Sequence, residues 1–148
     1  MATTTLHETD FYAWTQAQAA ALQQANFDQL DIANLIEEIE DMGKSQQRQL
    51  ESRLIVLLVH LLKWQFQPNK RSPSWEATIR IQRLELADLL ADNPSLRPRL
   101  PYFLERAWPK ARQGARGETG LDLKLFPSTH SYTLLQVFDD AFFPDATS

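Results

Sequence analysis

The stretch LIVLLVHLL, residues 54–62, decides the fold of this 148-residue chain. Its side chains would be apolar almost all round a helix, and such a helix belongs in the centre of a domain with other helices wrapped around it. The run is also too short to cross a bilayer, which takes about 20 mostly apolar residues. We therefore expect a buried core helix and no segment that spans a membrane.

Upstream of this run the chain continues one helical stripe in the same phase. The stripe comprises Ile32, Ile36, Ile39, Gly43, Gln46, Leu50 and Leu54. Residues spaced by three and four positions line one face of a helix, and Asp31 is a good N-cap before the first of them. The unbroken phase predicts a single helix over residues 32–66. Gly43 permits a break, so two helices joined by a short turn are the alternative.

Shorter helices are expected on both sides of the long one. Apolar residues at helical spacing predict a helix over residues 10–25, with Asp10 as its N-cap and Asn26 in the left-handed turn at its end. A second helix is predicted over residues 73–92, because a serine N-cap and a proline in the first turn open it. Residues 67–72 between these elements predict a loop.

The C-terminal third predicts two more helices. One runs from about Pro98 or Pro101 to Arg116. A short last helix begins at Thr133, which forms a capping-box pair with Gln136. With no alternating stretch long enough for a strand, the pattern predicts an all-α fold.

These elements assemble into a simple predicted organisation. The chain has the length of one domain, so we expect a single helical domain over residues 1–148, a bundle of about five helices around the long central helix. Residues 121–148 are expected to form an irregular tail that carries the short C-terminal helix.

Composition excludes several classes of protein. The chain has no cysteine, which excludes thiol catalysis, disulfide frameworks and thiolate metal sites. Its first ten residues lack the basic and apolar regions of a secretory signal. We therefore expect a soluble protein of the cytoplasm.

Charge is ordered along the chain. Residues 1–43 carry eight acidic side chains and no lysine or arginine, whereas residues 44–116 carry fourteen basic and six acidic ones. Residues 117–148 are acidic again. Either the acidic ends neutralise the basic middle, or a basic face stays exposed and attracts a polyanion.

One cluster of basic and aromatic residues could form such a face. Its members are Lys63, Lys70, Arg71, Trp75, Arg80 and Arg83, with Trp64 and Phe66 beside them. Single-stranded nucleic acid binds surfaces that combine phosphate contacts with aromatic stacking. The alternative is that the tryptophans pack into the core and the arginines stack on rings or pair with nearby acids.

The sequence contains no convincing catalytic or metal-binding pattern. The acids of residues 37–41 and His60 lie about 20 residues apart, some 30 Å along one straight helix, which is too far to share an ion. The chain has neither a nucleophile motif nor a glycine-rich phosphate loop. We expect no enzyme activity, no cofactor and no metal, and we expect His60 to be satisfied at the edge of the core.

Several stretches together resemble a known family. They are DFYAW (10–14), LDIANLIEEIEDMG (30–43), HLLKWQFQ (60–67), RSPSWEATIRIQR (71–83), NPSL (93–96) and ETGL (118–121). The chain resembles the bacterial domain-of-unknown-function family numbered twenty-nine, which is common in cyanobacteria. The resemblance implies an all-helical, single-domain protein, and it implies no functional residues.

By elimination, the sequence favours a non-enzymatic binding or regulatory module that acts through protein–protein contacts. The partner is either another protein or a second copy of the chain. The acidic face of the long helix, the basic middle and the aromatic tail are the candidate contact surfaces. A nucleic-acid-binding protein that uses the basic–aromatic surface of residues 63–83 is the alternative.

Overall fold

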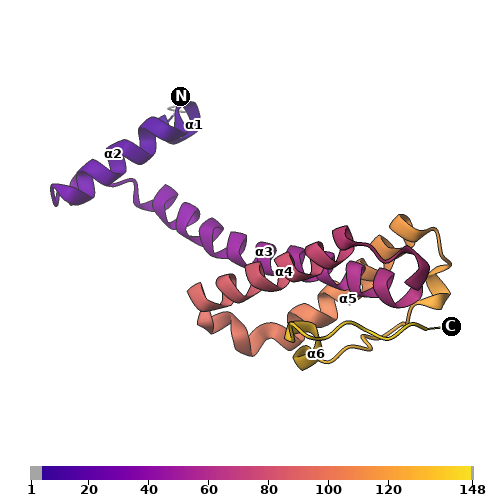
Figure 1. Cartoon of the computed structure of the whole chain (residues 1–148). Coiled ribbons are helices and arrows are strands. Elements are labelled where there is room, and N and C mark those ends of the chain that lie inside the picture. Colours follow the sequence, from indigo (N-terminus) through magenta and orange to yellow (C-terminus); the bar gives the residue numbers. More distant parts are fainter. Residues whose placement is uncertain (1–4, 148) are drawn as a thin grey trace. The chain divides into compact units, whose positions relative to one another are not determined.

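The computed structural model describes residues 5–147, so the first four residues and Ser148 of the predicted domain lie outside the described part (Figure 1). Its α-helices are α1 (Leu6–Thr9), α2 (Phe11–Gln23), α3 (Ile32–Phe66), α4 (Pro73–Asp92), α5 (Leu100–Thr119) and α6 (Leu134–Phe138). Short 3-10 turns lie at Phe27–Gln29, Pro68–Lys70, Pro94–Arg99 and Leu123–Leu125. No strand occurs within residues 5–147. The predicted all-α fold is confirmed.

The long helix is one uninterrupted element. α3 spans 35 residues with the predicted bounds, so the alternative of two shorter helices is wrong. Gly43 lies inside this helix, where the lack of a Cβ weakens helix formation by about 1 kcal/mol relative to alanine. Within residues 5–147 no helix is both long enough and apolar enough to span a membrane.

The chain divides into two compact units. The N-terminal unit is Met1–Ser45 and the C-terminal unit is Gln46–Ser148. α3 therefore contributes residues 32–45 to the first unit and residues 46–66 to the second. Both units are all-helical. The organisation as one domain over residues 1–148 stays a prediction.

The N-terminal unit contains α1, α2 and the first part of α3. Asp10 caps α2 as predicted, since its Oδ1 accepts a hydrogen bond of 3.0 Å from the backbone N–H of Ala13. The predicted left-handed residue at the helix end is wrong: Ala25 has the positive φ of 55°, and Asn26 does not. The backbone N–H of Asn26 reaches the carbonyl of Ala21 at 2.8 Å. This hydrogen bond closes the C-terminal end of α2 and places the left-handed residue at Ala25, one position before the predicted Asn26.

The C-terminal unit holds the hydrophobic core. The residues of α3 that are completely buried include Leu50, Leu54, Leu57, Leu58, Leu61 and Leu62. Ile79 and Leu86 of α4, with Ala107 and Ala111 of α5, are equally buried against them. Most of the segment that decided the fold is therefore buried, as its apolar circumference requires, whereas Ile55, Val56 and His60 are half-buried.

The C-terminal tail packs on the same unit. Thr133 and Gln136 form the predicted capping box at the start of α6. Phe126 and Val137 are almost completely buried, and Phe143 lies 4.9 Å from Trp64, ring centroid to centroid. The aromatic residues Phe138, Phe142 and Phe143 of the tail are half-buried and pack against this core. Binding of a partner through the aromatic tail stays a prediction.

Alanine substitution at two glycines of α5 should change the free energy of unfolding in opposite directions. A Cβ at Gly114 would lie only 2.8 Å from Cγ2 of Val59, a stiff β-branched side chain that is buried. A Cβ at Gly117 would meet no neighbouring atom of the described residues within 4 Å. We expect Gly114→Ala to lower the free energy of unfolding by about 1–3 kcal/mol through overpacking. Gly117→Ala should raise it by up to about 1 kcal/mol through better helix formation.

Urea denaturation of the two variants measures both effects. Equal changes in the free energy of unfolding at the two positions would contradict the close packing of α5 on α3.

Candidate functional site

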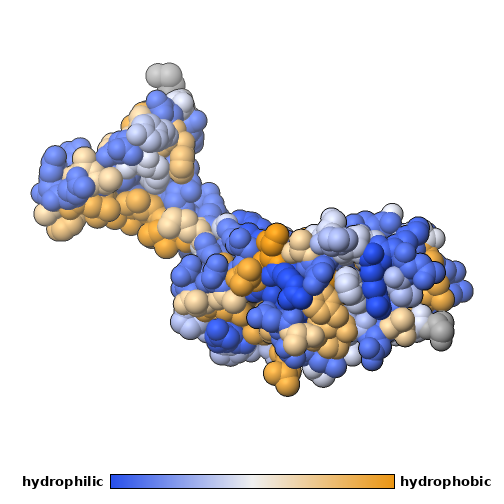
Figure 2. Space-filling model, viewed as in Figure 1, coloured by the Kyte–Doolittle hydropathy of each residue, from blue (hydrophilic) through white to orange (hydrophobic). Residues whose placement is uncertain are grey.

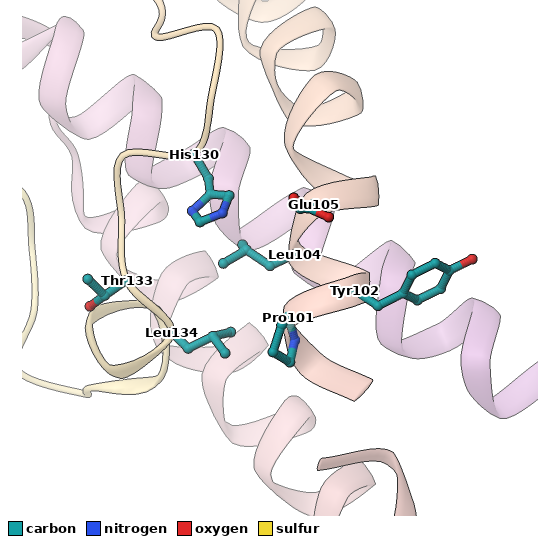
Figure 3. A pocket seen from close by; sticks show the side chains of 7 residues that line it. All are labelled: Pro101, Tyr102, Leu104, Glu105, His130, Thr133 and Leu134. Atoms are coloured by element: carbon teal, nitrogen blue, oxygen red, sulfur yellow. The ribbon is translucent and has the colours of Figure 1, made fainter. Parts of the chain in front are cut away.

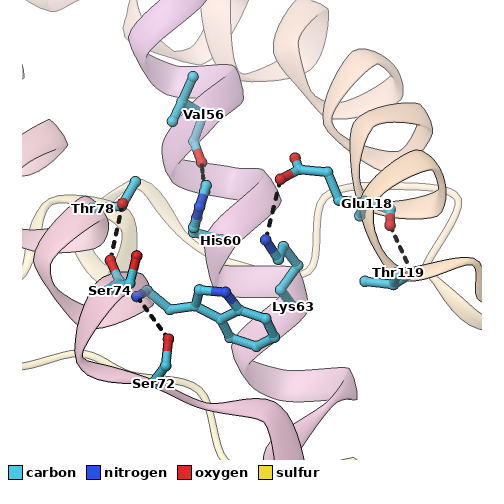
Figure 4. Close-up of polar contacts among 10 residues, drawn as sticks. Val56, His60, Lys63, Ser72, Ser74, Thr78, Glu118 and Thr119 are labelled. Carbon is cyan, nitrogen blue, oxygen red and sulfur yellow. Dashed lines mark hydrogen bonds and ion pairs between the residues drawn. The ribbon is translucent and has the colours of Figure 1, made fainter.

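Lys63 of the predicted basic–aromatic cluster lies inside the C-terminal unit. Its side chain is 9% exposed, and its Nζ donates to Oε1 of Glu118 on α5 at 3.1 Å (Figure 4). The same Nζ lies 4.5 Å from the centroid of the half-buried Trp75 ring. A buried ammonium needs such partners. The charge of Lys63 is thus compensated within the chain.

Two arginines of the cluster bind the C-terminal tail. Arg71 donates from Nε to the carbonyl of Trp64 at 2.8 Å and from Nη2 to the carbonyl of Pro144 at 3.4 Å. Arg83, which is buried, donates from Nε to the carbonyl of Val137 at 2.9 Å. These hydrogen bonds attach the tail to α3 and α4.

Arg83 is the most deeply buried charge of the cluster. Removal from water lowers the pKa of its guanidinium, while the carboxylates of Asp140 and Asp139 act in the opposite direction. Its Nη2 donates to the carbonyl of Gln136 at 3.3 Å, and its Nη1 is buried with no partner among the described residues. An arginine does not lose its proton in a protein, so the tail carbonyls stabilise a permanent buried charge.

The remaining members lie nearer the surface. Arg80 is exposed and pairs with Glu76 one helical turn away, with 2.9 Å between Nη2 and Oε1. Lys70 is exposed in the short turn after α3. The structure thus brings Arg71, Arg80 and Arg83 against the tail, and it places Lys63 against Trp75. Most of the positive charges of the cluster contact groups of the same unit. Nucleic-acid binding through these residues stays a prediction.

The N-terminal unit carries an unusual amount of exposed apolar surface. Nine of the fourteen large hydrophobic side chains that are exposed in the described chain belong to it. They are Leu6, Phe11, Tyr12, Leu22, Phe27, Ile32, Ile36, Ile39 and Met42. Hydrophobic residues accordingly gather along this part of the surface in Figure 2. Contiguous patches of this kind mark interaction sites more often than single exposed residues do.

The stripe of α3 contributes three residues to this surface. The stripe is buried from Leu50 onward, whereas Ile32, Ile36 and Ile39 are 55%, 52% and 63% exposed. One helix therefore continues one apolar face from a covered region into an exposed region. The exposed part has the composition of a core face without the neighbours that cover one.

A groove runs between α2 and this part of α3. We name it the α2–α3 groove; its volume is about 520 Å³. Its apolar lining is made by Phe11, Trp14, Leu22, Leu35, Ile39 and Met42. The only charged side chain that lines it is that of Glu38. The groove is mostly apolar, as binding sites usually are.

Polar contacts fix one end of the α2–α3 groove. Asp31 accepts from Nε1 of Trp14 at 3.1 Å and from Nδ2 of Asn34 at 2.8 Å, and its backbone N–H donates to Gln18. The hydrogen bonds from Asn34 and Trp14 hold the pKa of Asp31 below its ordinary value. At the other side, His7 of α1 and Glu38 of α3 are 2.7 Å apart. These contacts fix α1 and α2 against α3 and leave the apolar walls open.

The comparison with protein families identifies the chain. The family model described as "Domain of unknown function DUF29" matches residues 6–143. The chain belongs to the DUF29 family. The resemblance seen in the sequence is thus confirmed. No curated protein and no solved structure matches the chain.

The DUF29 domain has a second hollow in its C-terminal unit, shown in Figure 3. This open pocket of about 600 Å³ lies between the start of α5 and the segment before α6. Glu105 and His130 line it together with Leu104, whereas Tyr102 points away from them. Among the described residues no group of three or more metal-ligating side chains occurs. A single carboxylate beside a single exposed imidazole offers no complete catalytic arrangement.

His60 and the acids of α3 do not come together in this DUF29 domain. The Nδ1 of the half-buried His60 lies 2.9 Å from the backbone carbonyl of Val56, one turn earlier in α3 (Figure 4). This is the local satisfaction that the sequence predicted for it. The acids of residues 37–41 belong to the N-terminal unit, and Glu38 among them lines the α2–α3 groove.

Sequence reasoning missed the apolar residues of the α2–α3 groove. Phe11, Leu22 and Ile39 have the spacing of core residues, so periodicity alone assigns them to a core. The available signal was the combination of that stripe with eight acids and no base over residues 1–43. A short helical hairpin of this composition has too few apolar neighbours in its own sequence to cover its stripe.

Arg83 provides a test of how the tail of the DUF29 domain is held. We expect Arg83→Leu to speed hydrogen exchange of the backbone amides in α6 by at least about tenfold, because a net loss of about 1.5–3 kcal/mol per charged hydrogen bond exceeds the free energy of a tenfold change. Arg48→Leu replaces an exposed arginine of α3 and should leave this rate unchanged. Exchange measured by mass spectrometry compares the two; equal rates in α6 would contradict the anchoring role of Arg83.

Proposed function

We propose that this DUF29 domain is a protein-binding module and that the α2–α3 groove of its N-terminal unit is the contact surface. The single observation that carries the proposal is the exposed continuation of the α3 stripe. Ile36 and Ile39 of this stripe are 52% and 63% exposed, and Ile39 also lines the groove. Such a face is stabilised when another protein covers it.

The groove has enough apolar surface to support specific binding. Full burial of one large aliphatic or aromatic side chain contributes about 1.5–3 kcal/mol. Phe11, Leu22, Ile39 and Met42 are each about half exposed or more, so covering them together offers several kcal/mol. A few such residues at the centre of an interface usually supply most of its binding free energy.

The contacts of the basic–aromatic cluster favour this proposal over nucleic-acid binding. Lys63, Arg71 and Arg83 make hydrogen bonds within their own unit. A phosphate would have to compete with those contacts. Phe11, Leu22, Ile39 and Met42 of the groove, by contrast, are about half exposed or more. Protein binding would therefore cover apolar surface that the fold leaves exposed.

The test places a photo-crosslinking amino acid at Met42 of the full chain, in the cells that make the protein. We expect a discrete crosslinked protein, which mass spectrometry identifies and which is then purified for binding measurements. Ile39→Gln should weaken that binding by at least about tenfold, which corresponds to about 1.4 kcal/mol of lost apolar burial. Glutamine is a good helix former, so the variant keeps α3 intact.

Leu84→Gln is the matched control for this test. Leu84 lies on α4 of the C-terminal unit and is 62% exposed, compared with 63% for Ile39. The control should bind the partner like the unmodified chain. Equal weakening by both variants, or the absence of any discrete crosslink from Met42, would contradict the proposed function.

A further inference from the structure

The chemistry of the α2–α3 groove specifies its partner, provided that the proposed function holds. We infer that the groove binds an amphipathic helix of another protein, with lysine or arginine side chains beside its apolar face. The inference rests on three features: the shape of the groove, its lack of free backbone groups, and the sign of the charge around it.

The shape fits a helix. The walls of the groove are two helices, and a third helix packs along such a pair in every helical bundle. α2 has 13 residues, which at about 1.5 Å per residue give a wall roughly 20 Å long. A partner helix of three to four turns therefore spans the groove. Its apolar residues at positions i, i+3 or i+4, and i+7 would face the groove.

The lack of free backbone groups also requires a helix. Both walls are helices whose backbone groups are already hydrogen-bonded within each helix, and no strand edge exists within residues 5–147 to pair with an extended segment. Apolar side chains from Phe11 to Met42 dominate the lining, with Thr15, Gln18 and Glu38 as its polar members. A segment that enters the groove must therefore satisfy its own N–H and C=O groups, which an α-helix does.

The charge around the groove selects a basic helix. Residues 1–43 contain eight acidic side chains and no lysine or arginine, and the groove lies within them. Glu38 lines the groove, where it also contacts His7, and Asp41 is exposed on the same helix. Complementary charge beside an apolar contact accelerates association and excludes wrong partners. Basic side chains flanking the apolar face of the partner would meet these carboxylates.

The same charge argues against a dimer in which the grooves of two copies face each other. Two N-terminal units that face each other through their grooves would bring together two sets of eight acids with no base between residues 1 and 43. Like charges brought together at an interface oppose association. The acidic charge of the N-terminal unit thus favours a basic partner helix and disfavours pairing of two such units through their grooves.

The test uses three labelled peptides of about 18 residues, roughly five helical turns, and fluorescence anisotropy with the full chain. The first has leucines along one helical face and lysines beside them. The second has glutamate in place of each lysine, and the third has the first composition with the leucines scattered around the helix. At about 0.1 M salt we expect the basic amphipathic peptide to bind at least about tenfold more tightly than either of the others.

Salt and two variants separate the contributions. The ratio of the affinity for the basic amphipathic peptide to that for the acidic peptide should shrink as salt rises from about 0.1 M to about 1 M. The reason is that the Debye length falls from about 10 Å to about 3 Å. Ile39→Gln should weaken binding of the basic amphipathic peptide by about tenfold, and Leu84→Gln should leave that binding unchanged.

Three results would overturn the inference. Equal affinity for the basic and acidic peptides would show that the groove does not select a basic partner. Equal affinity for the basic amphipathic peptide and the peptide with scattered leucines would show that the groove does not recognise an apolar helical face. Binding of no peptide, together with a dimer that Ile39→Gln dissociates, would identify a second copy as the occupant. A discrete crosslinked partner from Met42 alongside any of these results would leave the proposed function standing, so the two failures are distinguishable.

Discussion

Burial of the α3 segment from Leu50 to Leu62 is the interaction on which the rest of the structure depends. α4, α5 and the tail all pack on this segment, and the same helix extends into the N-terminal unit, where it carries one wall of the α2–α3 groove. A helix keeps the phase of its apolar stripe along its whole length. The continuous stripe of α3 therefore explains both the stable core and the exposed apolar surface.

The core and the exposed surface have different consequences for function. The charges of the predicted basic–aromatic cluster stabilise the fold: Lys63 is paired with Glu118, and Arg83 holds α6 through the carbonyl of Val137. The groove, by contrast, exposes apolar side chains that no contact within the unit covers fully. This contrast directs the functional interpretation of this DUF29 domain from the basic middle to the acidic N-terminal unit.

Much of the fold follows from local sequence rules. The structure has the predicted phase of α3, the Asp10 and Ser72 caps and the Thr133–Gln136 capping box. Each of these features depends on residues that lie only a few positions apart in the sequence. The burial of Lys63 and Arg83 could not be predicted in this way, because their partners lie more than fifty residues further along the chain. Periodicity also could not show which half of the α3 stripe is covered, since that depends on tertiary neighbours.

Hydrogen exchange along α3 in the isolated full chain measures whether its apolar stripe is covered in one half and open in the other. Amides of residues 50–62 should exchange only by unfolding of the core, whereas amides of residues 32–45 should exchange through local opening, much faster. We expect a steep change in protection close to Leu50. Uniform protection over residues 32–62 would contradict it, because the N-terminal half of the stripe would then be as firmly covered as the core.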